Sequence, residues 1–113
     1  MKHDERQFLL TVGWMFLRHG RKLRAKHLFE ALVEADCRDG VAVAALSELL
    51  LDSGESQRVL ELLRMADFPA SLSYAEAVLE TRALKMSGRR RESESRWRRY
   101  LETKKGGARQ WIA

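Results

Sequence analysis

Apolar residues recur at intervals of three and four along most of the chain, which is the spacing of one face of an α-helix. Leu10, Trp14 and Leu17 form such a series near the start. Breaks fall at 37–40 and 67–70. The pattern predicts six helices, over 5–18, 22–35, 41–52, 56–66, 74–86 and 90–104. Ser73, with Glu76 three residues later, resembles a capping box for the fifth helix.

Three glycines, Gly20, Gly54 and Gly88, stand 34 residues apart, each between the two helices of a predicted pair. This period is typical of the tetratricopeptide repeat, whose unit is two antiparallel helices. The chain reverses direction inside each unit, and a positive φ at that point costs glycine far less than other residues. The spacing therefore predicts three repeats, at about 6–39, 40–73 and 74–104.

The other motif positions fit this register to different degrees. The first unit follows the size pattern of the repeat at Leu9, Val12, Gly13, Phe16, Ala25, Phe29 and Leu32. Small Gly13 and Ala25 would let the two helices approach, and bulky Phe29 would fill the space beside their crossing. The second unit has Ser47 where the motif has glycine or alanine. The third has Glu80 where the motif has an apolar residue.

The expected fold is therefore all-α: three tetratricopeptide-like helix-turn-helix repeats in one domain over residues 1–104, forming a short right-handed superhelix with a concave groove. Residues 105–113 are expected to form a flexible C-terminal tail, in which Trp111 and Ile112 either dock on the third unit or fray. The composition agrees, because 45% hydrophobic and 33% charged residues are typical of a soluble globular protein. Seven glycines and one proline argue for helix nearly throughout.

In this architecture the first helix of each unit lines the concave face, so the residues of that face can be named. They are Gln7, Leu10, Trp14, Leu17, Val41, Ala44, Glu48, Leu51, Val78 and Arg82. Most of the groove residues in the first two units are apolar, and an exposed apolar groove marks a partner site. The alternative is that the tail or a second copy of the protein covers it.

Basic residues gather toward the C-terminus. The chain has a net charge of +5, and residues 85–105 contain nine Lys or Arg against three Glu. Such a segment suits nucleic acid, an acidic protein surface, or only a solvated helix face. Trp97 and Tyr100 could stack on bases, but they occupy packing positions of the repeat. We therefore keep nucleic-acid binding as the alternative hypothesis to protein binding.

Residue types that carry chemistry are few. His3, His19 and His27 belong to no cluster of cysteine and histidine residues that would suggest a metal site, and Cys37 is the single cysteine. No phosphate-binding glycine loop occurs, since the Gly106–Gly107 pair follows no strand. We expect no enzyme activity, no metal and no cofactor. The chain has no run of eighteen apolar residues and no apolar leader, so we expect a cytoplasmic protein without membrane insertion.

A set of residues in the first unit also carries a family resemblance. The set is Arg6, Gln7, Phe8, Leu9, Leu10, Gly13, Trp14, Leu17, Gly20, Ala25, Leu28, Ala31 and Leu32. Together with the closing segment 97–102 and the chain length, it resembles the YscY family, small tetratricopeptide-type chaperones of bacterial type III secretion systems. The similarity is strongest over residues 6–37. The chain departs from the family at Ala70 and Ser71, where such repeats have a proline-containing turn, and in its arginine-rich segment 89–99.

The resemblance implies a cytosolic, non-enzymatic chaperone that binds a small secreted partner of the YscX type, keeps it soluble and helps to deliver it to the export gate. An amphipathic helix of the partner would lie in the groove. Other tetratricopeptide-type secretion chaperones, for needle or translocator subunits, and a general peptide-binding module of this repeat class remain alternatives. The sequence leaves open the partner's identity and whether the free chain is a homodimer.

Overall fold

The computed structural model describes the backbone of residues 2–112 and the side chains of residues 2–105. Its helices are α1 (His3–Arg18), α2 (Lys22–Ala35), α3 (Gly40–Asp52), α4 (Ser56–Met65), a 3-10 turn (Ala70–Leu72), α5 (Ser73–Met86) and α6 (Arg90–Ile112). Within residues 2–112 there is no strand, only an isolated bridge between Asp39 and Asp67. The predicted all-α fold with six α-helices is confirmed.

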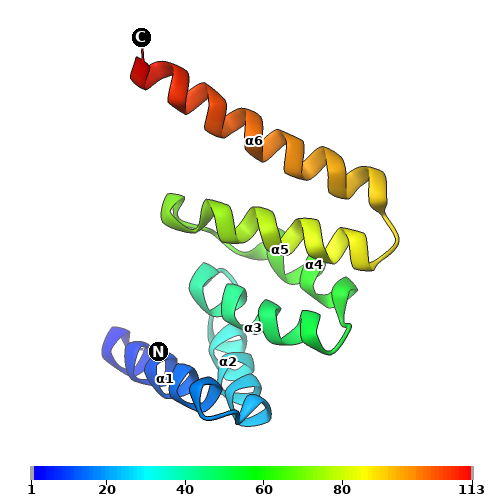
Figure 1. The fold of residues 1–113 in the computed structure, drawn as a ribbon. Coiled ribbons are helices and arrows are strands. Elements are labelled where there is room, and N and C mark those ends of the chain that lie inside the picture. Colours follow the sequence, from blue (N-terminus) through cyan, green and yellow to red (C-terminus); the bar gives the residue numbers. More distant parts are fainter. Residues whose placement is uncertain (1, 113) are drawn as a thin grey trace.

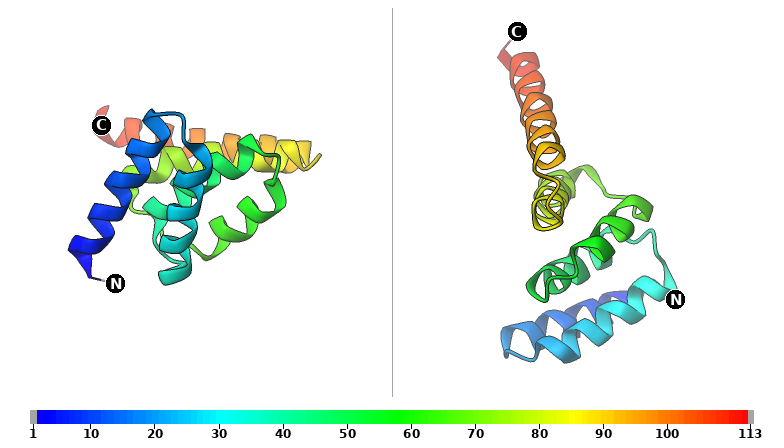
Figure 2. Two further views of the ribbon diagram at one scale, coloured as in Figure 1. Left: turned by 90° about the horizontal axis from the view of Figure 1, so that it is seen from below. Right: turned by 90° about the vertical axis from the view of Figure 1, so that its right-hand side faces the viewer.

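Each helix packs against the next along the chain, and α3 also packs against α5. Figure 1 shows the result as a stack, with α1 and α2 at one end, α3, α4 and α5 in the middle and α6 at the other end. In the right-hand view of Figure 2, α6 runs at a steep angle to α1 and α2. The helix directions therefore change along the stack.

The turns at the three glycines are built alike. Gly20, Gly54 and Gly88 have φ values of 73°, 79° and 79°, and no other described residue has a positive φ. The residue after each glycine donates its N–H to the carbonyl five positions earlier, with N···O distances of 2.8, 2.9 and 2.9 Å. This hydrogen bond is the mark of a Schellman motif, which ends a helix and reverses the chain. The predicted conformation of all three glycines is confirmed.

One hydrophobic cluster runs from Leu10 in α1 to Leu84 in α5. Its largest member, Phe29, is fully buried and lies where α1 meets α2. A Cβ atom on Gly13 would come within 2.6 Å of the Phe29 ring, so only glycine fits there without a shift. The predicted close approach of the two helices beside Phe29 is confirmed at Gly13, and Ala25 is fully buried.

A second close approach, which the sequence did not predict, joins two loops. A Cβ atom on Gly40 would lie 2.5 Å from the carbonyl oxygen of Asp67. The Asp67 N–H donates to the Arg38 carbonyl at 2.9 Å, and the Arg38 side chain pairs with the Asp67 carboxylate at 3.0 Å. The α2–α3 and α4–α5 loops are thereby held together, and Gly40 makes this contact possible.

The two departures from the repeat motif have different structural outcomes. Ser47 is fully buried, and its hydroxyl has no hydrogen-bond partner among the described residues. Glu80, by contrast, accepts a hydrogen bond from Arg96 Nε at 2.9 Å, and the Arg96 side chain is only 13% exposed. A charged residue is therefore tolerated at an apolar position because the neighbouring helix supplies its counter-charge.

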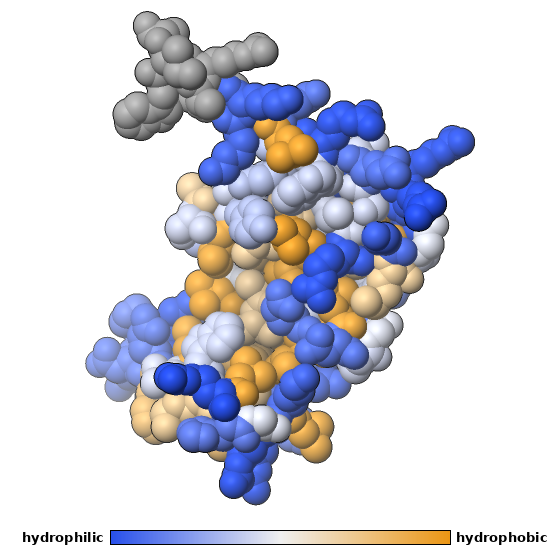
Figure 3. All heavy atoms as spheres, viewed as in Figure 1, coloured by the Kyte–Doolittle hydropathy of each residue, from blue (hydrophilic) through white to orange (hydrophobic). Residues whose placement is uncertain are grey.

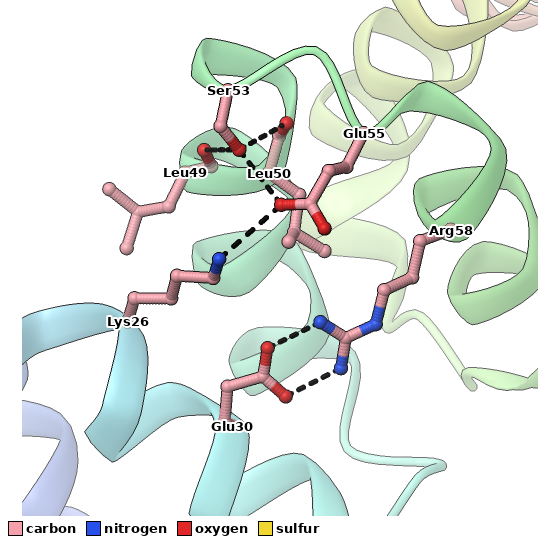
Figure 4. A network of polar contacts seen from close by, with 7 residues as sticks. All are labelled: Lys26, Glu30, Leu49, Leu50, Ser53, Glu55 and Arg58. Atoms are coloured by element: carbon pink, nitrogen blue, oxygen red, sulfur yellow. Dashed lines mark hydrogen bonds and ion pairs between the residues drawn. The ribbon is translucent and has the colours of Figure 1, made fainter. Parts of the chain in front are cut away.

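Ion pairs also tie α2 to α4 and to the turn before it (Figure 4). Arg58 makes a two-pronged ion pair with Glu30, in which Nη2 lies 2.5 Å from Oε2. Lys26 Nζ lies 3.3 Å from Glu55 Oε2, which also accepts a hydrogen bond from Ser53 Oγ at 2.9 Å. The Arg58 hydrogen bond holds the pKa of Glu30 below its usual value, and this carboxylate therefore stays charged in the folded protein.

Two local predictions need correction. The sixth helix does not end at 104 but continues to Ile112, because the residues after the two tail glycines, Ala108 to Gln110, favour helix. The proposed docking of Trp111 and Ile112 concerns side chains outside the described residues. The fifth helix starts at Ser73 with Leu72 as its N-cap and no side-chain cap, so the capping box at Ser73 is wrong. The preceding 3-10 turn places Ser73 inside the helix.

Candidate protein-interaction surface

Two of the predicted groove residues, one on α3 and one on α5, meet in space. Arg82 Nη1 lies 3.0 Å from Glu48 Oε2, so residues 34 positions apart in the sequence form an ion pair on the surface. Val41 and Ala44 on α3 and Val78 on α5 are partly exposed. Figure 3 shows apolar side chains over the middle of the face that carries α3 and α5, with charged side chains gathered over α6.

The α1 members of the predicted groove are exposed to different degrees. Trp14 is 47% exposed, and its ring meets Phe29 edge to face, with ring centroids 5.7 Å apart. Gln7 is exposed and Leu17 is half-buried. An indole that is braced on a buried ring while half its surface faces solvent can bind an apolar partner with little loss of conformational freedom.

Two of the predicted groove leucines lie in the core instead. Leu10 is 5% exposed and Leu51 is 2% exposed, and both belong to the main hydrophobic cluster. The helix turns these side chains toward the neighbouring helices rather than toward the open face. Their assignment to an open groove is corrected, and the binding role of the other eight residues stays a prediction.

The start of α3 is tied to α1 by a charged contact. Arg6 Nε and Nη2 lie 2.6 and 3.0 Å from the two oxygens of Asp39. Asp39 Oδ1 also accepts a hydrogen bond from the N–H of Ala42, so the same carboxylate is the N-cap of α3. The Arg6 hydrogen bond lowers the pKa of Asp39 below its usual value, because both contacts favour the charged form.

The aromatic residues of the basic segment pack on one another. Trp97 and Tyr100 stack at a centroid distance of 5.4 Å, and Tyr74 contacts both rings at 6.4 and 6.0 Å. Tyr100 is 9% exposed. The structure thus places Trp97 and Tyr100 in packing positions, as the repeat register predicts, with Tyr100 buried and Trp97 half-buried.

The sequence did not reveal a cleft between α4 and α6, floored in part by α5. It has a volume of about 480 Å³, with an apolar floor that includes Leu60, Leu63 and Leu84. Arginines border it, among them Arg91 and Arg99 on α6, with Ser95 between them. These three α6 residues recur at every fourth position, a helical spacing that could have indicated a shared face.

The side chains that could bind a metal or act as a nucleophile do not cluster within residues 2–105. Among residues 2–105, no three His, Cys, Asp or Glu side chains gather as a metal site would require, and Cys37 is half-buried and free. No described helix is long and apolar enough to cross a bilayer. The fold and surfaces define an all-α protein of packed helices, with partly apolar exposed positions on α1, α3 and α5 and an arginine-lined cleft between α4 and α6. Neither a family model nor a curated protein matches the chain.

Proposed function

We propose that the chain is a tetratricopeptide-like chaperone of the YscY kind, which binds a small secreted partner of the YscX type in the cytosol and helps to deliver it for export. The binding face comprises the exposed and half-buried groove residues: Gln7, Trp14, Leu17, Val41, Ala44, Glu48, Val78 and Arg82. The partner contributes an amphipathic helix whose apolar side lies along α1, α3 and α5.

The repeat assignment is supported by geometry that recurs with the sequence period. The turns at the three glycines share one φ value to within a few degrees and one hydrogen-bond pattern. The Glu48–Arg82 pair joins residues that are 34 positions apart. Stacked units of this kind leave one helix of each pair on a common face, which is the usual binding surface of helical repeats.

The observation that carries the binding proposal is the exposure of Trp14. Large aromatic residues with a rigid backing are the usual anchors of protein interfaces. Trp14 is held against Phe29 and still offers half of its surface. On α3 and α5, the partly exposed side chains of Ala44 and Val78 are small and would let a helix approach the surface of these two helices closely.

Co-purification tests this function. The tagged chain is purified from its native host while secretion is active, and bound proteins are identified by mass. The expected result is one small secreted protein at equal amounts, whose soluble level falls when the chain is deleted. A chain that elutes without such a partner, or a secreted protein whose solubility does not depend on the chain, contradicts the proposal.

A further inference from the structure

The cleft between α4 and α6 has the features of a second binding site. Its volume of about 480 Å³ is within the range of small-ligand pockets, about 300–1,000 Å³, so it holds a short segment rather than a folded domain. Leu60 and Leu63 from α4 and Leu84 from α5 form an apolar floor. Each of these leucines is 6–7% exposed and most of the lining is polar, so the cleft offers a ligand a small apolar contact among charged groups.

The walls of the cleft carry an excess of positive charge. Five arginines line it against two glutamates, Glu80 and Glu92, which are paired with Arg96 and Arg89. Within residues 2–105, the three remaining arginines, Arg64, Arg91 and Arg99, form no ion pair with a carboxylate. All three are exposed. They are free to pair with carboxylates of a ligand.

From this charge and shape we infer that the α4–α6 cleft binds a short acidic peptide segment of another protein, with a leucine-like side chain on the Leu60–Leu63–Leu84 floor and carboxylates at Arg64, Arg91 and Arg99. This site is separate from the Trp14 face, because the two use different residues. The helix that they share, α5, contributes Glu80 and Leu84 to the cleft but Val78 and Arg82 to the Trp14 face. A chaperone with both surfaces holds its partner on one and is recognised through the other.

The lining of the cleft favours a peptide over nucleic acid. Within residues 2–105, no aromatic residue lines the cleft, and Trp97 and Tyr100 are stacked on each other, so these residues offer no platform for bases there. The chain's own tail is a poor occupant as well, since its only charged side chain after Lys105 is Arg109.

The test uses fluorescence anisotropy with a fluorescein-labelled peptide in which glutamates flank two leucines four residues apart. Wild-type protein is expected to bind this probe with an affinity that falls as salt rises, because the arginines are exposed. The double variant Arg91→Glu/Arg99→Glu should weaken binding by at least about tenfold. The matched control, Arg90→Glu/Arg98→Glu, makes the same charge change on the same helix outside the cleft, and should weaken binding less than about threefold.

Three outcomes would overturn the inference. Equal losses in the two double variants would mean diffuse attraction to a basic helix. Unchanged binding of a probe with serines in place of the leucines would remove the apolar floor from the site. Tighter binding of single-stranded DNA than of the peptide at physiological salt would assign the cleft to nucleic acid. If a glutamate variant does not fold, Arg91→Gln/Arg99→Gln replaces it with the same expected direction. Trp14→Ala should bind the probe like wild type, which separates this site from the proposed chaperone face.

Discussion

Glu48 of α3 and Arg82 of α5 are 34 residues apart in sequence and form an ion pair at 3.0 Å. Both occupy the same place in the period that the glycines mark, so α3 and α5 pack with a register of one full period. Trp14 is the equivalent residue of α1, where the first unit has a half-exposed indole in place of a charge. Residues that are one 34-residue period apart in the sequence therefore lie side by side on α3 and α5.

The three glycine turns should respond alike to substitution. Gly20→Ala, Gly54→Ala and Gly88→Ala should each lower the free energy of unfolding by about 1 kcal/mol, because a Cβ disfavours positive φ. No atom of the described residues lies within 4 Å of the Cβ added at any of the three positions, so the cost is a backbone cost alone. Urea denaturation measures it. Gly54→Asn is the control and should cost less than Gly54→Ala, since asparagine tolerates this conformation better; alanine variants as stable as wild type would contradict the turn geometry.

Ser47→Ala should stabilise the protein by about 1 kcal/mol. The Ser47 hydroxyl is fully buried and has no hydrogen-bond partner within residues 2–105, so its removal relieves a desolvation cost. Ser93→Ala is the matched control, because Ser93 is also buried but donates to the Thr81 carbonyl at 2.9 Å. In thermal melting, the Tm of Ser47→Ala should therefore be higher than the Tm of Ser93→Ala. The reverse order would show that Ser47 has a partner.

The Glu80–Arg96 pair should behave as a unit. Glu80→Leu restores the apolar residue of the motif but leaves Arg96 largely buried without its counter-charge, so it should cost about 1–3 kcal/mol. The double variant Glu80→Leu/Arg96→Leu should recover most of that loss, because an apolar pair replaces a charged one. A double-mutant cycle by urea denaturation measures the coupling. Additive losses would mean that the two side chains do not depend on each other.

Acid should weaken the fold through Asp39 and Glu30. Contacts with Arg6 and Arg58 lower the pKa of each carboxylate in the folded state. Their contribution to stability is therefore complete above the unfolded pKa values, about 3.8 and 4.5, and is lost as pH falls through the lowered folded values. Asp39→Asn keeps an N-cap oxygen but removes the charge, so its stability should fall less steeply between neutral and acid pH.

Urea midpoints over a pH series measure this slope. Asp4→Asn, at an exposed site in α1, is the control and should retain the wild-type slope. An Asp39→Asn slope as steep as that of the wild type would contradict the role of the Arg6–Asp39 contact.

The sequence predicted those parts of the fold that depend on local conformation and period. The glycine turns, the helix count and the packing of Phe29 beside Gly13 follow from φ preferences and residue size. The Gly40–Asp67 contact could not be predicted, because it joins two loops whose approach depends on how whole helices stack. Likewise, Glu80 departs from the apolar position of the motif, and the sequence does not show that Arg96 on the adjacent helix supplies its counter-charge.

The candidate surface was predicted less well for the same reason. Repeat positions say which side of a helix faces the groove, but not how far a neighbouring helix covers it. Leu10 and Leu51 are covered, while Trp14 is not. The α4–α6 cleft was missed because its residues come from three helices, and the spacing within one helix does not show which faces of different helices meet.

The dissociation constant of the secreted partner for Trp14→Ala protein tests the central proposal most directly. Truncation of a half-exposed interface tryptophan should weaken binding by about 2 kcal/mol or more, roughly thirtyfold, while circular dichroism retains the helical signal. Phe8→Ala is the control, because Phe8 lies on another side of α1 and is 66% exposed. It should bind like wild type. A Trp14→Ala variant that is folded and binds the partner as tightly as wild type would contradict the account.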